Sequence, residues 1–459
     1  MEKVITNRRV YYYISYLIVV ALFNVISVFF LDWQMIAGLD LFMLAVLFLS
    51  YFPVVGLYMM AILYPFSGWY MIYGGFNAPY HDVLGVTLFA GMILRSIILY
   101  IEGKKHYKQI ILQYFPGLLL FGLFFGASLL STIRSEEIFV ELKYLLRPIL
   151  FFYLIYIVLP INIIKTKKQI LNVVKLMVAS GLFSALLGFL SVVSNEGGWF
   201  ARRAVPYHFF GYNLLGGNHN AMAETMIATI PLIFLLFVLS DKFRIKGWYI
   251  LGILFSTVIL LLTFSRTGWL ALLVELLVLY FAFRKRHFKK AAVSFVILLI
   301  IVSLVSFYFI VWNEVGEVQG STSSRLMMTQ ISITQFLQSP IIGNGLNSFN
   351  FLVGSTFSYW VEFGDALDAH GLIQKQITES GILGLLTYLS LLGYFVYRYY
   401  KFYREADSLK QRRIAMICLM MIFGVIFFQF FSTSYYGSRM WFPIAIGYSV
   451  LMLQHKKVL

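Results

Sequence analysis

The sequence predicts an all-α, polytopic integral membrane protein with about 12–14 transmembrane helices and one large extracytoplasmic loop. Of its 459 residues, 60% are hydrophobic and only 12% are charged, which is more apolar surface than a water-soluble domain can bury. Runs of about 17–24 apolar residues recur along the chain and are long enough to cross a bilayer as helices. Clusters of Lys and Arg alternate between the connecting loops, as membrane topology requires.

The apolar runs define fourteen expected spans. They lie near 10–31, 35–52, 53–73, 83–101, 113–130, 144–160, 170–194, 219–240, 247–264, 266–283, 291–312, 381–399, 414–431 and 439–454. Two junctions are less clear, at Phe52-Pro53 and at Ser265-Arg266, where two shorter or bent helices fit equally well. The first run is long enough to span and many others follow it, so we expect no cleavable signal peptide.

The basic residues orient these spans. With the N-terminus in the cytoplasm, most of the 36 basic residues fall in loops on the cytoplasmic side, and the C-terminus is cytoplasmic as well. The formal charge of +16 then reports topology and attraction to anionic lipid, and no basic patch interleaved with aromatic residues points to nucleic acid. The single cysteine, Cys418, excludes a disulfide framework and a cysteine metal site.

We divide the chain into membrane helices at 1–312, a large extracytoplasmic loop at 313–380, and C-terminal membrane helices at 381–459. In the loop, the run Ser321 to Ser324 is expected to cap a helix. Leu326, Ile333 and Leu337 follow at helical spacing, which predicts an amphipathic helix lying along the membrane surface.

His370 lies at the end of this loop and is the candidate catalytic residue. Histidine accepts a proton near neutral pH without a perturbed environment, so it is a natural general base for activating a hydroxyl. The alternative is a solvated surface histidine with no catalytic role. The stretch HGLIQKQITESGILG, from His370 to Gly384, supplies the spacing that favours catalysis.

Arg266 is the candidate anion-binding residue nearest to an expected span. It lies in LTFSRTGW, where one apolar run ends and the next begins, and a cation there costs about 2–3 kcal/mol unless it is paired or hydrated. A bound anion would offset that cost. The planar fork of arginine suits a diphosphate, because it donates two parallel hydrogen bonds to phosphate oxygens. The alternative is that Arg266 extends to the headgroup region.

Three stretches carry a resemblance to the bacterial O-antigen ligase and polymerase family. The spacing from His370 to Gly384 resembles the family pattern H-[NSQ]-x9-G-x-x-[GTY], and LTFSRTGWLALL and SSRLMMTQISITQFLQSPIIGNGLNSF fit the same family in order and separation. The resemblance covers roughly 218–384. Two features depart from it: Gly371 replaces the usual amide or hydroxyl residue, and FFSTSYYGSRMW offers hydroxyls where many family ligases carry a late carboxylate.

The resemblance implies a GT-C-like membrane glycosyltransferase that needs no cofactor and no metal. Arg266 and Arg325 would grip the diphosphate of an undecaprenyl-linked glycan donor. His370 would take the proton of the acceptor hydroxyl in an inverting transfer. The active site would face the periplasm or the cell exterior from a bacterial cytoplasmic membrane.

The resemblance includes two activities that differ in the acceptor, and the missing late carboxylate and the additional spans favour the polymerase over the ligase. A polymerase joins lipid-linked repeat units to one another in surface polysaccharide biosynthesis, with a chain-length regulator protein as a candidate partner. A ligase transfers the finished glycan to lipid A core or another anchor. A polysaccharide flippase is the alternative from another class, but it predicts charges at mid-depth or repeated halves, and the sequence shows neither.

Further residues are candidates for secondary roles. Arg147 is either a third anion contact or the ion-pair partner of Glu141 or Glu137. Glu224 and Glu275 lie within expected spans, so each must be paired, protonated or hydrated. The remaining features are the additional substrate-contact candidates Arg202, Arg203 and Arg439, the expected tight turn at Gly343 and Gly345, the expected helix cap Asn218 before His219, and the loop residues Asp365 and Asp368.

Overall fold

The computed structural model describes residues 14–16, 18–21, 32–73, 76–101, 110–134, 138–196, 202–282, 315–364, 368–432 and 434–456. These residues are almost entirely helical, and their only paired strands of more than one residue are β1 (Tyr70–Tyr73) and β2 (Phe76–Pro79). Eight of the described helices are long and apolar enough to cross a membrane. The prediction of an all-α, polytopic membrane protein is confirmed.

The helices follow the predicted apolar runs. The eight candidate spans are α2 (Trp33–Tyr51), α4 (Tyr80–Ile101), the continuous helix Ile138–Ile163, α8 (Lys167–Ser194), α9 (His219–Leu239), α10 (Phe243–Leu262), α17 (Gly381–Arg404) and α18 (Leu409–Gln429). Other helices at predicted span positions are α3 (Pro53–Leu63), α5 (Leu118–Ser131), α11 (Arg266–Ala282) and α19 (Ser438–His455). The expected spans 10–31 and 291–312 lie largely or wholly outside the described residues.

The expected span 53–73 is wrong in its second half. Helix α3 ends at Leu63, and residues 70–73 form strand β1. Pro65 follows the helix and has no N–H to continue it. The backbone N–H of Gly68 instead donates to the carbonyl of Leu214 at 3.0 Å, which fastens the turn to the loop before α9.

The continuous helix Ile138–Ile163 is composite. It consists of α6 (Ile138–Tyr144), two π-helical segments, η2 (Leu145–Ile149) and η3 (Phe152–Val158), and α7 (Leu159–Ile163). Pro148 lies inside the first π segment and removes one backbone donor, which accounts for the departure from α-helical bonding there. Arg147 precedes this proline, so it is carried on an irregular turn of the helix.

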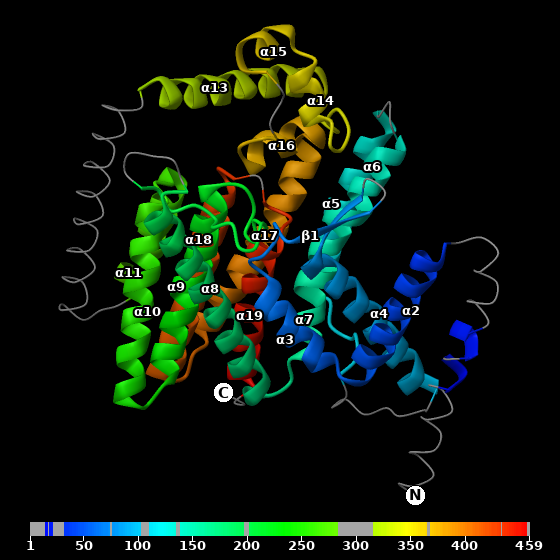
Figure 1. Cartoon of the computed structure of the whole chain (residues 1–459), viewed down its shortest axis with the longest axis vertical. Helices are drawn as coiled ribbons and strands as arrows, with labels where there is room; N and C mark the ends of the chain where they lie inside the picture. Colours follow the sequence, from blue (N-terminus) through cyan, green and yellow to red (C-terminus); the bar gives the residue numbers. More distant parts are fainter. Residues whose placement is uncertain are drawn as a thin grey trace, which may run out of the picture.

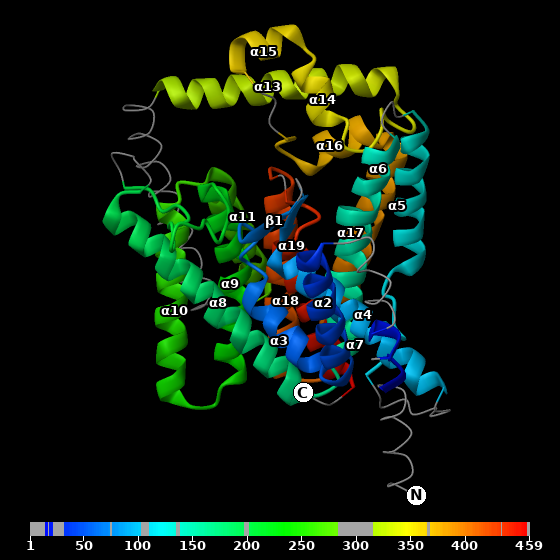
Figure 2. The ribbon, with the colours of Figure 1, turned by 45° about the vertical axis from the view of Figure 1, so that its right-hand side comes forward.

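A polar layer covers one end of the bundle. It consists of α13 (Val315–Gln338), α14 (Phe349–Gly354), α15 (Phe357–Phe363) and α16 (Leu372–Glu379), drawn in yellow and orange at the top of Figure 1. Helix α13 lies across the long helices both there and in the turned view of Figure 2. The expected helix in this loop is therefore present. Leu326, Ile333 and Leu337 are 61%, 49% and 70% exposed on it.

The expected helix cap at Ser321 to Ser324 is wrong. Helix α13 begins at Val315 and runs through these serines without interruption. Serine and threonine favour helix ends because their hydroxyls can satisfy unpaired backbone donors, but a run of them is also tolerated inside a helix. Arg325 is consequently a residue of the helix interior, about three turns from its first residue.

Candidate active site

The N-termini of α9 and α11 are joined by a hydrogen bond beneath the polar layer. Asn218 caps α9 by accepting a hydrogen bond from Ala221 N at 3.1 Å, as expected. Ser265 caps α11 by accepting one from Gly268 N at 3.2 Å, and its hydroxyl donates to Asn220 Oδ1 at 2.8 Å. The first residues of the two helices, His219 and Arg266, therefore lie at adjoining positive ends of helix dipoles.

Arg203 brings a further cation to the same place. Its Nε donates to the carbonyl of Thr263 at 3.0 Å, and the neighbouring Ala204 N donates to Leu262 O at 2.8 Å. These bonds hold the loop before α9 against the end of α10. The imidazole of His219 then lies within electrostatic range of the guanidinium groups of Arg203, Arg266 and Arg325.

Arg325 and His370 reach this cluster from the polar layer. Helices α13 and α16 are joined by the hydroxyls of Ser332 and Thr378, which lie 2.5 Å apart. The side chain of Gln374 accepts from His370 N at 3.1 Å and donates to Thr329 on α13 at 3.3 Å. The helix that carries Arg325 and the turn that carries His370 are thereby held as one unit.

The electrostatics of this unit suit a general base. Burial and the positive charge of Arg325 lower the pKa of His370 below its usual value, and Asp368 opposes them only in part. His370 is therefore neutral at pH 7 and able to accept a proton. Burial and the neighbouring charge of Arg266 also lower the pKa of Arg325, although arginine stays charged in proteins.

Arg266 and Arg325 are not balanced by a carboxylate within the described part of the chain. The ion pairs there include neither Arg266 nor Arg325, and Nε of Arg325 is buried without a hydrogen-bond partner. Like charges held together cost free energy unless an anion joins them. We call Arg203, His219, Arg266, Arg325 and His370 the cationic cluster.

A buried network supports His370 from behind. Lys375 is 2% exposed, and its Nζ lies 2.7 Å from Asp368 and 3.5 Å from Glu379. Burial disfavours the charged amine, but the carboxylates of Glu379 and Asp368 outweigh it and raise the pKa of Lys375 above its usual value. The ion pair Lys375–Asp368 fixes the backbone two residues before His370.

The glycine after His370 has a packing reason. A Cβ atom at Gly371 would lie 2.5 Å from the carbonyl oxygen of Phe430, which is closer than atoms in contact approach. The amide or hydroxyl residue of the family pattern does not fit against this backbone. The departure at Gly371 therefore follows from the close approach of the turn to the end of α18.

The expected turn at Gly343 and Gly345 is also present and packs tightly. Both glycines have positive φ angles, 77° and 109°, a region that side chains rarely adopt. A Cβ at Gly345 would lie 2.2 Å from Glu141, whose other oxygen accepts from Leu346 N at 2.9 Å. The turn thus locks the polar layer onto α6.

Glu224 is paired, and its partner is Arg439. Arg439 Nε lies 2.9 Å from Glu224, which is 3% exposed, and Ser434 donates to both carboxylate oxygens at 2.9 Å. Ser434 belongs to FFSTSYYGSRMW, the stretch of hydroxyls without a carboxylate. The fold therefore places a carboxylate from α9 beside that stretch. Glu275, in contrast, is buried without a hydrogen-bond partner among the described residues.

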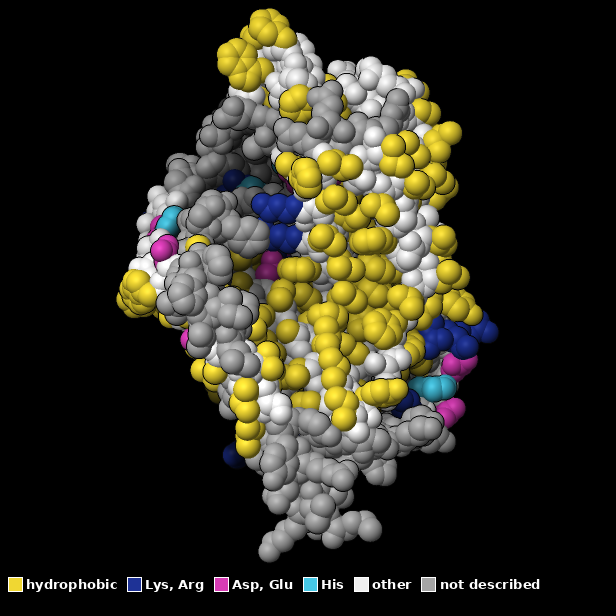
Figure 3. All heavy atoms as spheres, turned by 90° about the vertical axis from the view of Figure 1, so that its right-hand side faces the viewer, with side chains coloured by type: hydrophobic (Ala, Val, Ile, Leu, Met, Phe, Trp, Pro, Cys, Tyr) yellow, Lys and Arg dark blue, Asp and Glu magenta, His cyan; other side chains and the backbone are white. Residues whose placement is uncertain are grey.

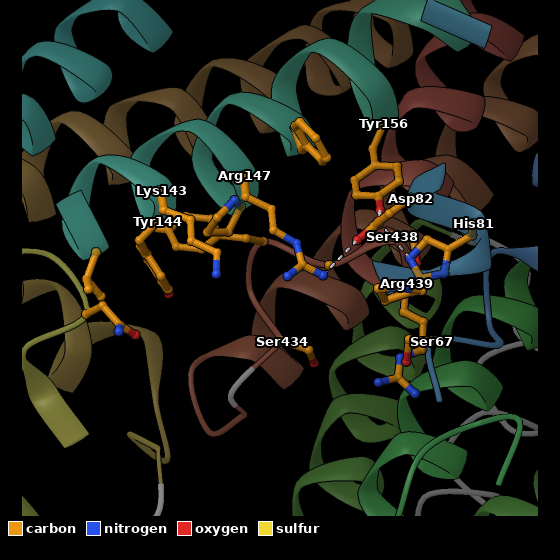
Figure 4. Close-up of a pocket in the computed structure, with 17 residues that line it drawn as sticks. Ser67, His81, Asp82, Lys143, Tyr144, Arg147, Tyr156, Ser434, Ser438 and Arg439 are labelled. Carbon is orange, nitrogen blue, oxygen red and sulfur yellow. Dashed lines mark hydrogen bonds and ion pairs between the residues drawn. The ribbon is translucent and has the colours of Figure 1, made fainter. Parts of the chain in front are cut away.

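Arg147 and Arg439 line a separate cavity of about 480 Å³. Figure 4 shows Lys143 and Arg147 reaching into it from one wall and Arg439 from another. The carboxylate that approaches Arg147 is Asp82, at 4.0 Å, whereas Glu141 binds the glycine-rich turn and Glu137 lies outside the described residues. Arg202 is exposed, and no contact joins it to the cationic cluster in the part of the chain described.

Residues 251–389 match the family model described as O-Antigen ligase. The matched segment supports a protein of the O-antigen ligase and polymerase family. The matched segment contains Arg266, Arg325 and His370, which the sequence assigned to the site on the family's motifs. No curated protein matches the chain. The family gives the chain an O-antigen ligase-like function, and it provides no support for the flippase alternative.

Two members of the site were missed by the sequence analysis. His219 follows the helix cap Asn218, so the sequence gives it no separate role. Only the packing of α9 against α11 shows that it lies beside three arginines. Lys375 lies in the motif beside His370 but reads there as an ordinary surface lysine. Its signal was the pair of acidic residues Asp368 and Glu379, seven residues before it and four residues after it.

The described residues gather no group of three His, Cys, Asp or Glu side chains that could hold a metal ion. Asp365, one of the two loop aspartates named from the sequence, lies outside the described residues. Asp368 is instead the partner of Lys375. The cationic cluster itself suits an anion and has no arrangement of ligands for a cation.

Proposed function

We propose that this protein polymerises undecaprenyl-diphosphate-linked oligosaccharide repeat units by glycan transfer at the outer face of the cytoplasmic membrane. The observation that carries the proposal is the cationic cluster, in which three arginines lie within electrostatic range of His219, and neither Arg266 nor Arg325 forms an ion pair with a described carboxylate. Such a site favours a ligand with several negative charges, and a diphosphate has that character. The family match supports a lipid-linked glycan as the substrate.

The reaction needs one bond broken and one formed at the anomeric carbon of the donor. The acceptor hydroxyl oxygen attacks that carbon, and the bond from the carbon to the diphosphate oxygen breaks with its electron pair. His370 takes the hydroxyl proton, for which its neutral form is required. Arg266 and Arg325 stabilise the charge that develops on the departing polyprenyl diphosphate. Direct displacement inverts the anomeric configuration.

Ligase activity is the second candidate, because the matched family model is described as O-Antigen ligase. The absence of a late carboxylate from FFSTSYYGSRMW argued against it in the sequence. Glu224 accepts a hydrogen bond from Ser434 in that stretch, so this argument loses weight. The chemistry at the donor is the same for both activities, and only the acceptor differs.

Transfer by purified protein distinguishes the candidates. A lipid-diphosphate-linked repeat unit would be incubated with wild type and with His370→Ala, in the presence of EDTA. We expect wild type to form a ladder of lipid-linked products and His370→Ala to be slower by about 10²–10⁴-fold, the usual contribution of a general base. Transfer only after a separate anchor acceptor is added would identify a ligase. Equal activity of His370→Ala would refute the catalytic assignment, and loss of activity with EDTA would refute metal independence.

A further inference from the structure

The cavity that Arg147 lines continues into a second, apolar groove of about 590 Å³. Asp82, Lys143, Arg147 and Phe151 line both spaces. The rest of the groove wall is apolar and comes from α2, β2, α4 and the helix Ile138–Ile163: Phe42, Ala78, Val83, Val86, Phe139, Leu142 and Leu146. A charged chamber thus leads directly into a hydrophobic channel.

The groove opens on the outer surface of the bundle. Phe139 and Leu146 on its rim are 85% and 53% exposed, which is the exposure expected of side chains that face lipid. Figure 3 shows a broad hydrophobic face with basic side chains gathered at one margin beside a hollow. A molecule with an acyl or prenyl chain can therefore enter from the bilayer without crossing a polar barrier.

The charges at the junction favour an anionic headgroup. Among the described residues that line the charged cavity, Lys143, Arg147 and Arg439 are cationic and Asp82 is the one carboxylate. Asp82 accepts hydrogen bonds from Tyr156 and lies 3.2 Å from His81 Nε2, so its charge is already shared with neighbours. Arg439 is paired with Glu224. Arg147 lies 4.0 Å from Asp82. Lys143 and Arg147 line both the charged cavity and the groove, which places them to meet a headgroup at the mouth of the groove.

We propose that this chamber and groove bind a second polyprenyl diphosphate, the lipid anchor of the acceptor. The diphosphate would contact Lys143 and Arg147, and the first isoprene units would occupy the groove while the remaining chain extends into the bilayer. This assignment rests on the proposed polymerase function, because only a polymerase uses a diphosphate-linked lipid on both sides of the transfer. Both cavity volumes fall within the range of about 300–1,000 Å³ that is usual for ligand pockets.

The position of this site fits an acceptor. Arg439 lines the chamber and donates to the carbonyls of Leu215 at 2.9 Å and Ala221 at 3.5 Å, which lie on either side of His219 in the cationic cluster. The two sites are therefore neighbours separated by the start of α9. An acceptor whose diphosphate is bound at Lys143 and Arg147 would extend its glycan toward His370. The reacting hydroxyl of that glycan is several atoms away from the diphosphate, so the two sites need to be neighbours and not the same.

Counting bound lipids tests the proposal. Wild-type protein in lipid nanodiscs would be titrated with undecaprenyl diphosphate and measured by native mass spectrometry. We expect two bound molecules per chain in wild type and one in Lys143→Gln/Arg147→Gln, with the lost site weakened by about 10–100-fold for each charged hydrogen bond removed. The matched control is Lys242→Gln/Arg244→Gln, which removes two basic residues at the start of α10 and should leave both sites intact.

A second pair of variants tests the groove without changing charge. Leu146→Trp would fill the groove from an exposed rim position, so folding should tolerate it and the second lipid should be lost. Leu130→Trp, at an exposed position on α5, should have no effect. If Leu146→Trp binds two lipids, or if phosphatidylglycerol occupies the site as tightly as undecaprenyl diphosphate, the assignment is overturned.

The outcomes separate this proposal from the proposed function. One bound lipid in wild type, lost in Arg266→Gln/Arg325→Gln but not in Lys143→Gln/Arg147→Gln, would overturn the second site and leave the donor site standing. One lipid lost only in Lys143→Gln/Arg147→Gln would overturn the donor site instead. In a transfer assay, Lys143→Gln/Arg147→Gln should raise the KM for the acceptor about 10-fold or more and leave the donor KM unchanged.

Discussion

Two sets of arginines lie at the same end of the helical bundle and differ in how their charge is balanced. Arg439 faces Glu224, and the serine and glutamine side chains of Ser434 and Gln429 satisfy that carboxylate as well. Arg266 and Arg325 face each other, and no described carboxylate lies between them. An arginine that is paired with a carboxylate stabilises the packing of helices, whereas an arginine without such a pair is available to bind an anionic ligand. The comparison therefore separates a structural cation from a binding cation in one chain.

Removing Arg439 should have the largest effect on stability. Arg439→Gln leaves Glu224 buried and unpaired, which costs about 3–5 kcal/mol for a broken buried pair. Thermal unfolding in detergent should show a large decrease in Tm. The double variant Glu224→Gln/Arg439→Gln should recover most of the loss because no charge is then stranded. A Tm for Arg439→Gln equal to that of wild type would show that the pair is not structural.

The sequence predicted the membrane architecture well and the balance of charges poorly. Apolar run length and loop charge located the helices, because a bilayer imposes both. The break at Leu63 was missed because the run to Tyr73 is mostly apolar, although Pro65 ends the helix and Gly68 contacts Leu214. The family motifs located Arg266, Arg325 and His370 in the sequence.

The sequence could not show which carboxylate balances which cation. Glu224 and Arg439 are separated by more than two hundred residues, and Glu141 was a plausible partner for Arg147 because the two lie close in the sequence. The fold instead assigns Glu141 to the glycine-rich turn and brings Asp82 to Arg147. Such pairings depend on tertiary packing between helices that no local pattern encodes.

A substitution in the turn beside Arg266 and Arg325 should reduce stability less than the loss of Arg439 does. Gly371→Ser restores the type of residue that the family pattern has after the histidine, but its Cβ would meet the carbonyl of Phe430 at 2.5 Å. We expect the overpacked variant to lose about 1–3 kcal/mol of stability and to be less active. Thermal unfolding and the transfer assay would measure both. A more active and equally stable Gly371→Ser would show that the close approach is not a constraint.

The pH dependence of transfer should give the smallest effect. His370 must be neutral to accept a proton, so activity should fall as the pH decreases through its pKa, which burial and Arg325 hold below the usual value of about 6.5. Asp368 raises the pKa of His370, so Asp368→Asn should move the acidic limb to lower pH. A limb that moves to higher pH would contradict this electrostatic account of His370.

The central claim is that Arg266 and Arg325 bind a diphosphate and do not stabilise the fold. The direct measurement is the rate of glycan transfer from a polyprenyl-diphosphate donor by Arg266→Gln and Arg325→Gln, with Tm measured on the same samples and Arg244→Gln as control. We predict a loss of about 10²–10³-fold for each site variant, an unchanged Tm, and wild-type behaviour of the control. Site variants that transfer glycan at the wild-type rate, or that lose activity only together with Tm, would contradict the account.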